Sequence, residues 1–449
     1  MIAIRLSEMA LALGLPAPEQ DRLLTSIVVD SRKAGDGSLF AALPGSRVDG
    51  HDFIRCAAEL GAQAVLVNRR VDVAVPQLVV ADVLAALGRL AQLVRDKLDP
   101  VVIGITGSNG KTTVKEMLAS ILRQQGEVLA TEGNFNNELG VPLTLFRLQE
   151  KHQFAVLELG ASKTGDIARL AAVCRPHIGL VTNIGPAHLQ GFGSEEGVAR
   201  AKGELYAALP ETGCAIFNGD QPWCSLWRRL NTAQRVLTFG EGSDSDIRLE
   251  FDDAAPRIHT PQGDFETHPT LPGRHNLINA AAATAAAIAL NIPLQKISQG
   301  LRVVKPVPGR LNLIHADAGW TVIDDTYNAN PASLYSALQV LSGMQGTAWL
   351  VLGDMKELGE DSHKMHAEVG EAARALGVSR IFATGDMSLF TADAFGEGAQ
   401  HFSDQSNLVE ALRKALRPGI NCLVKGSRSM GMERVVQAIT APKPLREAC

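Results

Sequence analysis

The feature that most constrains this chain is an apolar run followed by a glycine-rich turn and a helical pattern, over residues 101–122. The stretch reads Val101-Val-Ile-Gly-Ile-Thr-Gly-Ser-Asn-Gly-Lys-Thr-Thr-Val-Lys-Glu-Met-Leu-Ala-Ser-Ile-Leu122. Its first six residues have the apolar, β-branched composition of a fully buried strand. After Lys111, apolar residues recur at the spacing of one helix face, which predicts a packed helix. A strand, a tight turn and a helix in this order indicate an α/β fold built in layers.

The turn between this strand and helix has the properties of a phosphate-binding loop. A helix N-terminus that follows a glycine-rich turn presents backbone N–H groups and a positive dipole end to an anion. The lysine can reach the terminal phosphates of a nucleotide, and the next threonine can place a hydroxyl on Mg²⁺. A plain tight turn would have a similar sequence, but the strand before it and the helix after it favour phosphate. The predicted nucleotide contacts are Gly107, Ser108, Asn109, Gly110, Lys111, Thr112 and Thr113.

The spacing of the glycines argues against the commonest nucleotide loops. The usual P-loop has a glycine, four further residues and then Gly-Lys-Ser/Thr. Counting back from Gly110, the first glycine should stand at 105, where the chain has Ile105, and the available glycine is Gly107. The loop therefore belongs to a different class of phosphate-binding protein.

The rest of the chain repeats the same alternation of apolar runs and helical patterns. With 449 residues, about 150 per domain predicts roughly three domains. A helix over Val83–Leu98 marks one boundary, and Lys305-Pro-Val-Pro-Gly-Arg310 interrupts the pattern at another. The predicted domains are 1–84, 85–308 and 309–449. The predicted strands are Val101–Thr106, Phe154–Leu159, Ile178–Ile184, Thr321–Asp324, Trp349–Leu352, Arg380–Ala383 and Asn421–Val424.

Charge and composition exclude several classes of partner. The net charge of −5 provides no basic field, so we expect no nucleic-acid partner and no attraction to anionic membranes. Glu8 stands where a signal peptide would be apolar, and the alanine-rich run over 279–290 is too short to span a bilayer. The six cysteines show no CxxC spacing typical of metal sites. We expect a cytoplasmic monomer with no membrane insertion.

Three further residues could carry chemistry. Glu158 lies in an apolar strand, where a lone carboxylate is costly unless it is paired or binds a metal, although a solvent-facing strand end would also fit. His188 follows the strand 178–184, at the end of the strand where such sheets place ligands. Lys202, in a helical pattern, has the sequence context of an exposed surface lysine.

The loop Thr106-Gly-Ser-Asn-Gly-Lys-Thr-Thr113 resembles that of the Mur ligase family and its relatives, the folylpolyglutamate synthases. In that family the first glycine has this shifted position, and the members join an amine to a carboxylate at the expense of ATP. The resemblance covers essentially the whole chain, in order. It implies an α/β fold of three domains. These are a uridine-nucleotide domain, a central, mostly parallel sheet with a mononucleotide-binding P-loop, and a C-terminal Rossmann-like domain.

The same resemblance implies a metal site and a modified lysine. Glu158 and His188 match the family's metal-binding strands, and Lys202 matches a lysine that reacts with CO₂ to form a carbamate. A carbamate requires a neutral, desolvated amine. The implied cofactors are ATP and Mg²⁺ at two sites, bound through Thr112, Glu158, His188 and the Lys202 carbamate. Lys111, His188 and Lys202 are the implied catalytic residues.

Other matching segments imply contacts to the nucleotide and to the second substrate. The segment Gly273-Arg-His-Asn-Leu-Ile-Asn-Ala280 resembles the family's adenine-holding helix and places Asn279 at the nucleotide, with His275 and Asn276 nearby. The start of the last domain opens with Arg310 and with the neighbours Asp324 and Asp325. These two aspartates point to opposite faces of a strand, so only one can serve a given site. The family match favours Asp325, with Arg310, as contacts to the ribose or phosphates. The implied substrate contacts are Ser31, Arg32, Asn134, Asn137, Asn328 and Asn330.

The segments 133–142, 352–359 and 425–430 resemble the branch of the family that adds D-alanyl-D-alanine to UDP-N-acetylmuramoyl-tripeptide. The chain also lacks the arginine of the Asp-Asn-Pro-Arg motif of members that add diaminopimelate or lysine, since Ala332 follows Pro331. The implied mechanism forms an acyl phosphate on the tripeptide, which the amine then attacks. The alternatives are another amino-acid-adding Mur ligase, a folylpolyglutamate synthase-like ligase and, outside the enzymes, a regulatory ATP-binding protein that would not need Lys202.

Overall fold

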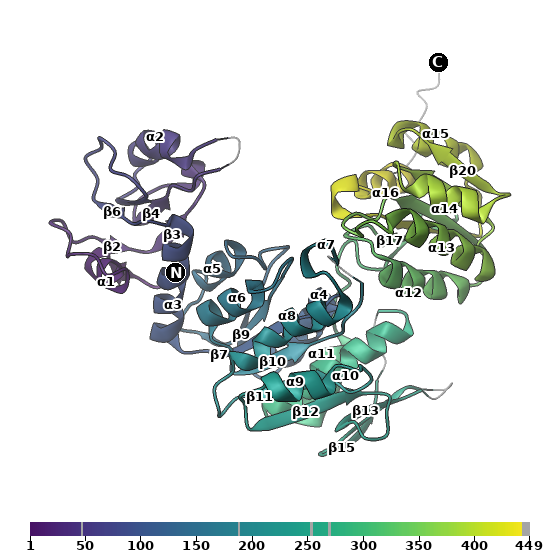
Figure 1. Ribbon diagram of the computed structural model, residues 1–449, viewed down its shortest axis with the longest axis horizontal. Helices are drawn as coiled ribbons and strands as arrows, with labels where there is room; N and C mark the ends of the chain where they lie inside the picture. Colours follow the sequence, from purple (N-terminus) through teal and green to yellow (C-terminus); the bar gives the residue numbers. More distant parts are fainter. Residues whose placement is uncertain (46–47, 187–188, 252–254, 268–270, 442–449) are drawn as a thin grey trace.

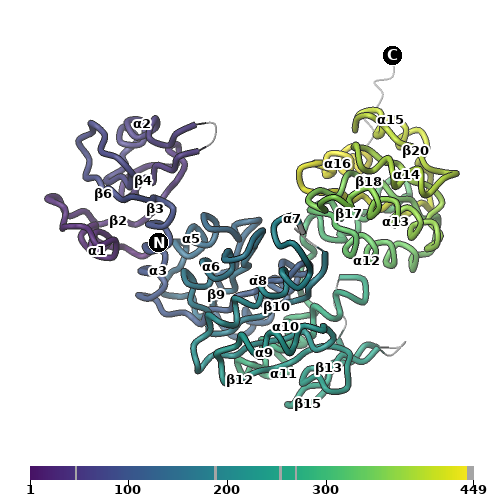
Figure 2. The backbone as a smooth tube through the Cα atoms, viewed as in Figure 1, coloured from purple at the N-terminus to yellow at the C-terminus, as the bar shows by residue number. Residues whose placement is uncertain are grey.

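The computed structural model describes residues 1–45, 48–186, 189–251, 255–267 and 271–441. Within these residues the strands form four sheets, and the largest, with nine strands, lies in the middle of the molecule. Figures 1 and 2 show the first and last parts of the chain at opposite ends of this central sheet. The fold is α/β with mostly parallel sheets, as predicted from the sequence.

The first part of the chain contains two small sheets. An antiparallel pair is followed by a four-stranded parallel sheet in the order β3-β4-β5-β6. The helix α3 (Val83–Leu98), capped by the Asp82 side chain, leads from here to the central sheet. The other elements are β1 (Ile4–Arg5), α1 (Leu6–Ala12), β2 (Leu23–Leu24), β3 (Ser26–Val28), β4 (Ser38–Ala41), α2 (Ile54–Glu59), β5 (Ala64–Val67) and β6 (Gln77–Val79).

The central sheet has the order β15-β14-β13-β12-β11-β10-β7-β9-β8 and is parallel from β8 to β13. The last two strands, β14 and β15, are antiparallel. The strands are β7 (Val101–Thr106), β8 (Glu127–Ala130), β9 (His152–Glu158), β10 (Ile178–Val181), β11 (Cys214–Asn218), β12 (Arg235–Gly240), β13 (Ile247–Glu250), β14 (Arg257–Thr260) and β15 (Gly263–Glu266).

Helices cover both faces of the central sheet. The helices α4 (Lys111–Leu122), α10 (Arg274–Ala289) and α11 (Leu294–Arg302) pack together on one face. The alanines of α10 are buried, and their small side chains let this helix lie close to α4 and the strands. The other face carries α3, α5 (Gly140–Leu145), α6 (Asp166–Cys174), α8 (Glu195–Ala207) and α9 (Cys224–Leu230), with α7 (Leu189–Phe192) against α8.

The last part of the chain is a six-stranded sheet in the order β16-β17-β21-β18-β19-β20, parallel except for β16. Its strands are β16 (Asn312–His315), β17 (Thr321–Asp325), β18 (Thr347–Gly353), β19 (Arg380–Thr384), β20 (Ala399–Phe402) and β21 (Ile420–Lys425). One hydrophobic core lies under α12 (Pro331–Ser342), α13 (Ser362–Ala375) and α14 (Ser388–Phe395). A second core lies under α15 (Gln405–Ala415) and α16 (Glu433–Thr440).

Most of the predicted strands are confirmed within two residues at either end. The prediction for 178–184 is wrong at its end, because β10 stops at Val181. The next residues leave the sheet to bind the glycine-rich loop, where the Thr182 hydroxyl donates to the Asn109 carbonyl over 2.6 Å.

Of the two predicted domain boundaries, one falls inside a helix and the other falls between two elements. The one at 84/85 lies inside α3, and the one at 308/309 lies between α11 and β16. The division into 1–84, 85–308 and 309–449 stays a prediction. Among the described residues, every helix is too short or too polar to cross a lipid bilayer.

Candidate active site

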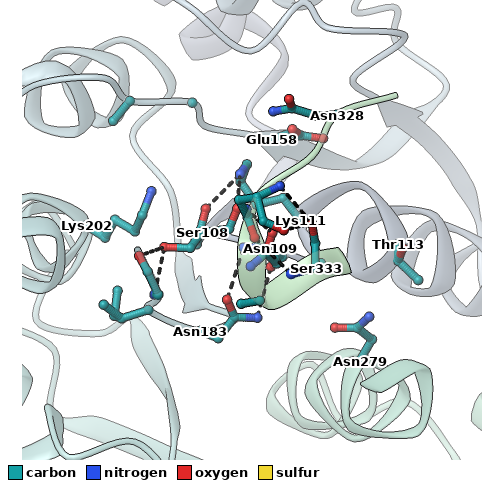
Figure 3. A pocket seen from close by; sticks show the side chains of 18 of the residues that line it. Ser108, Asn109, Lys111, Thr113, Glu158, Asn183, Lys202, Asn279, Asn328 and Ser333 are labelled. Atoms are coloured by element: carbon teal, nitrogen blue, oxygen red, sulfur yellow. Dashed lines mark hydrogen bonds between the residues drawn. The ribbon is translucent and has the colours of Figure 1, made fainter. Parts of the chain in front are cut away.

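A cleft of about 830 Å³ lies between the glycine-rich loop and the first strands of the C-terminal sheet. Figure 3 shows Lys202 on one side of the loop and Asn279, which comes from α10, on the other. A cleft of this size suits a nucleotide-sized ligand. Of the sequence-predicted residues, it is lined by Gly107, Ser108, Asn109, Gly110, Lys111, Thr113, Asn137, Glu158, Lys202, Asn279, Arg310, Asp325, Asn328 and Asn330.

The glycine at 107 is required by a close approach of two strands' ends. It has φ 149°, and a Cβ atom there would lie 1.8 Å from the Thr182 hydroxyl oxygen. The neighbouring amides are fixed by Asn183, which accepts from Ser108 N over 2.9 Å and from Asn109 N over 3.0 Å. The shifted glycine therefore reflects the packing of β7 against β10 at this end of the sheet.

The N-terminus of α4 points its free amides at the cleft. The first helical bond runs from Val114 N to the Gly110 carbonyl over 2.9 Å, so the amides of 111–113 precede the helix's own ladder. These donors and the helix dipole favour an anion. Lys111 donates from Nζ to the Gly107 carbonyl over 2.7 Å, and burial lowers the pKa of this amine, against the opposing charge of Glu158.

Thr112 and Glu158 form an oxygen pair beside the loop. The Thr112 hydroxyl donates to Glu158 Oε2 over 2.8 Å, and Asn136 Nδ2 donates to Glu158 Oε1 over 2.8 Å. Glu158 is 2% exposed, so the solvent-facing alternative is wrong. A hydroxyl and a carboxylate are hard oxygen donors that suit Mg²⁺, which takes few protein ligands and binds substrate phosphates as well. Among the described residues no three His, Cys, Asp or Glu side chains cluster to hold a metal by themselves.

Lys202 is buried, contrary to its surface-like sequence context. It lies on α8 at 2% exposure, and its Nζ is 5.9 Å from the centre of the Phe192 ring. Burial, together with the positive charge of Lys111, lowers the pKa of Lys202 well below its ordinary value. The side chain still lines the cleft, so an amine whose pKa is lowered by burial faces the same space as Glu158. His188 lies outside the described residues.

The C-terminal sheet contributes directly to the loop. Arg310 Nη2 donates to the Thr112 hydroxyl over 2.9 Å, and its guanidinium stacks 4.0 Å from the Tyr327 ring centre. Asn330 Nδ2 donates to Asn109 Oδ1 over 2.8 Å. These bonds join residues more than 190 positions apart, so the loop is shared by two parts of the chain.

Asp325 is buried in an ion pair with Lys425, from the adjacent strand β21. Lys425 Nζ also donates to the Asn328 carbonyl over 2.9 Å. Asp324 lies on the other face, as predicted, where it accepts from Gly309 N over 3.0 Å. Lys425 also faces His275, whose pKa is lowered to about 4, mainly by burial.

The predicted substrate residues are not all in this cleft. Ser31 and Arg32 do not line it, and Arg32 instead pairs with Asp30 over 2.8 Å on the surface of the first sheet. Asn134 is exposed and absent from the lining, whereas Asn137 lines it and also accepts from Gly140 N over 2.8 Å, at the start of α5.

Four residues of the site were missed by the sequence analysis. Asn136 donates to Glu158, and Asn183 accepts from the loop. Tyr327 stacks on Arg310, and Lys425 pairs with Asp325. Asn136, Asn183 and Lys425 lie within segments that the sequence analysis named, and Tyr327 lies two residues after Asp325. The apolar strand before Lys425 could have signalled a buried, and therefore paired, lysine.

Comparisons with known proteins agree with this geometry. Three family descriptions match the chain in order. These are the catalytic domain of the Mur ligase family over residues 24–95, the Mur ligase middle domain over 105–287 and the Mur ligase glutamate ligase domain over 309–428. The chain is 42% identical to the UDP-N-acetylmuramoyl-tripeptide--D-alanyl-D-alanine ligase of Escherichia coli (strain K12), over 98% of this chain and 99% of that one.

Two solved structures share the fold over most of their length. A crystal structure of MurF from Acinetobacter baumannii has a TM-score of 0.90 and 35% identity, covering 98% of this chain and 99% of that one. MurF ligase from Thermotoga maritima in complex with ADP has a TM-score of 0.83 and 28% identity, covering 92% and 97%. By its sequence along the whole length and by its fold, the chain belongs to the Mur ligase family.

Proposed function

We propose that this chain joins D-alanyl-D-alanine to UDP-N-acetylmuramoyl-tripeptide in an ATP-dependent reaction that releases ADP and phosphate. The observation that carries the proposal is the arrangement of the phosphate loop, the Thr112–Glu158 pair and the buried amine of Lys202 around one cleft. The choice of substrates is supported by the E. coli relative, whose name states this reaction. The ADP complex of the T. maritima structure supports nucleotide binding.

The loop residues bind the nucleotide and stabilise the charge on the transferred phosphoryl group. The amides of 111–113 and the Lys111 ammonium lie where negative charge develops on the γ-phosphate. The terminal carboxylate of the tripeptide attacks this phosphorus, so that ADP leaves and an acyl phosphate forms. The amine of D-alanyl-D-alanine then attacks the acyl carbon, and phosphate leaves as the amide forms. Arg310 and Asp325 line the cleft from the C-terminal side. In this proposal they are the contacts of that side to the ribose or phosphates.

The protein residues also suit Mg²⁺ and a carbamate. Thr112 and Glu158 would hold one Mg²⁺ through oxygen atoms, and a carbamate on Lys202, with His188, would hold a second. When bound, Mg²⁺ neutralises phosphate charge and orients the reacting oxygens. The buried amine of Lys202 fits carbamate formation, because its lowered pKa favours the unprotonated form and only that form attacks CO₂.

The acyl phosphate must be protected from water during the reaction. Because closure would exclude this water, we infer that the C-terminal part, 309–449, moves as a rigid body to close on ATP. Arg310 and Asn330, which bond to the loop, mark the face that would close. Small-angle scattering should report a smaller radius of gyration with an ATP analogue and the uridine substrate than without them. Superimposable curves would refute the closure. Ser31, Arg32, Asn134, Asn137 and Asn328 complete the proposed substrate contacts, and the enzyme acts as a monomer in the cytoplasm.

The test of the function is phosphate release with each component omitted in turn. Release should require ATP, Mg²⁺, UDP-N-acetylmuramoyl-tripeptide and D-alanyl-D-alanine together, with the pentapeptide product detected by mass spectrometry. Release that ignores D-alanyl-D-alanine but responds to another amino acid would keep the ligase and overturn the substrate. A folylpolyglutamate synthase-like ligase would respond to glutamate. Failure with every amine would favour a non-enzymatic ATP-binding role.

A further inference from the structure

Lys115 is a buried lysine to which the reaction assigns no role. It lies on α4, three residues after Thr112, and it is 1% exposed. Lysines are almost never fully buried unless their ammonium group is paired, because removing the charge from water is costly. Its surroundings should therefore explain why an apolar side chain does not take its place.

The ammonium group of Lys115 joins α4 to the end of β8. Nζ donates to the Thr131 carbonyl over 2.5 Å and lies 2.7 Å from Glu116 Oε1. Thr131 is itself 1% exposed and directly follows β8, where its amide donates to the Val156 carbonyl of β9 over 3.1 Å. Lys115 thus fixes the point at which β8 ends beside β9.

Thr131 then contacts the residue proposed to hold Mg²⁺. Its hydroxyl accepts from the Glu158 amide over 3.0 Å. A single buried threonine therefore receives Lys115 at its carbonyl and the backbone of Glu158 at its hydroxyl. The carboxylate of Glu158 is fixed separately, by Thr112 and Asn136. The chain of contacts runs from Lys115 to Thr131 and on to Glu158.

The position of this series of hydrogen bonds matters because it begins on the helix that carries Thr112 and ends on the strand that carries Glu158. Thr112 and Lys115 are three residues apart near the start of α4, while Glu158 ends β9. A shift of the β8 end would move Glu158 relative to Thr112. Partners that orient ligating carboxylates commonly affect metal affinity without touching the metal.

We infer that Lys115, acting through Thr131, is a positioning residue that holds Glu158 in register with Thr112 for Mg²⁺ binding. The inference rests on the proposed role of Glu158. A purely structural role, joining α4 to β8, would alter stability but would not distinguish metal-bound from metal-free nucleotide. Buried ion pairs add little net stability compared with apolar side chains, so the ammonium group is not required for packing alone.

The test is calorimetric titration of ADP into the full-length protein, with Mg²⁺ and with a chelator. The ratio of the two dissociation constants gives the gain in affinity that Mg²⁺ provides. Lys115→Met should reduce this gain about tenfold and leave the affinity for metal-free ADP unchanged. Thr131→Val, which removes only the hydroxyl link, should reduce it similarly, and Thr131→Ser should restore it. The double variant should be no worse than either single one.

Lys296→Met serves as the matched control. Lys296 donates to Gln125 Oε1 over 2.8 Å where α11 packs near α4. The substitution therefore removes a lysine hydrogen bond beside the same helix but away from Glu158. In this variant, the gain in ADP affinity that Mg²⁺ provides should equal that of the wild type. The inference would be overturned if Mg²⁺ increased the ADP affinity of Lys115→Met as much as that of the wild type, or if the variant lost affinity for metal-free ADP to the same extent. If Lys115→Met does not fold, the same measurement on Thr131→Val decides. A wild type without any gain would overturn the role of Glu158 as well.

Discussion

The buried ion pair between Asp325 and Lys425 gives the sharpest prediction about stability. The two residues are opposite each other on β17 and β21, and their side chains are 11% and 3% exposed. Burial raises the pKa of Asp325 and lowers the pKa of Lys425, and in each case the partner's charge opposes the effect of burial. Removing one partner should therefore leave the other as an uncompensated buried charge.

The loss in the free energy of unfolding depends on the contacts that the remaining charged side chain keeps. After Lys425→Met, Asp325 keeps the hydrogen bond from the Leu311 amide, at 3.2 Å, and the more distant positive charge of Arg310. After Asp325→Asn, Lys425 keeps the Asn328 carbonyl, at 2.9 Å. Breaking a buried pair in this way costs about 3–5 kcal/mol. Replacing both partners, as Asp325→Leu with Lys425→Met, should recover most of this loss, because no charge then remains buried.

The two single variants should respond to pH in opposite directions. In Lys425→Met, the folded pKa of Asp325 lies above its unfolded value, so stability is full below the unfolded pKa and falls as pH rises toward the folded one. In Asp325→Asn, the folded pKa of Lys425 lies below its unfolded value. Here the unfolded state binds more protons between the two values, and stability rises with pH. Each slope can reach about 1.4 kcal/mol per pH unit.

Urea unfolding followed by tryptophan fluorescence measures these slopes. The pH series runs upward from the ordinary aspartate pKa of 3.8 for Lys425→Met and downward from the ordinary lysine pKa of 10.5 for Asp325→Asn, because the two pKa values are shifted in those directions. Trp320 and Trp349 report on the C-terminal sheet, since Trp349 lies in β18 and Trp320 donates to the Ile439 carbonyl over 3.2 Å. Slopes of the same sign in the two variants, or single-variant losses below about 1 kcal/mol, would refute the reasoning about this buried pair.

Three further predictions concern the loop and its metal. Gly107→Ala should abolish nucleotide binding in an ADP titration while the protein stays folded by circular dichroism, because the new Cβ would lie 1.8 Å from the Thr182 hydroxyl oxygen; wild-type affinity would contradict this. Thr112→Val should lower kcat/KM about 100-fold with Mg²⁺, since it removes one oxygen ligand, and should leave metal-free ADP affinity unchanged. Lys202→Ala should lose activity that added bicarbonate does not restore, whereas wild type depleted of CO₂ should regain activity with bicarbonate; activity unaffected by the substitution would exclude the carbamate.

The loop was well predicted because its signals are local. The strand over 101–106 and the helix over 111–122 have the bounds that the apolar pattern indicates. The positive φ values at Gly107 and Gly110 explain why these positions are glycine. The family resemblance added residues from distant segments, and the structure brings Arg310, Asn279 and Glu158 to the same cleft.

The parts that were missed depend on tertiary packing. Lys115 and Lys202 have the sequence contexts of ordinary helix lysines, and only the packing of other elements around their helices buries them. Lys425 ends an apolar strand, which indicates burial, but its partner Asp325 comes from a distant part of the sequence. The contact of Asn136 with Glu158 was missed for a similar reason, while Asn134 and Asn137 stay predicted substrate contacts. Sequence gives their proximity to the cleft, but whether Asn136 points at Glu158 depends on how the 131–137 segment lies against β9.

The central claim is that an acyl phosphate joins ATP cleavage to amide formation, and isotope transfer tests it most directly. The terminal carboxylate of UDP-N-acetylmuramoyl-tripeptide would be labelled with ¹⁸O, and the phosphate released in the complete reaction would be analysed by mass spectrometry. The account predicts that each phosphate carries one oxygen from the carboxylate, with amide formed in equal amount. Unlabelled phosphate would show that ATP is cleaved without activating the carboxylate, and would contradict the account.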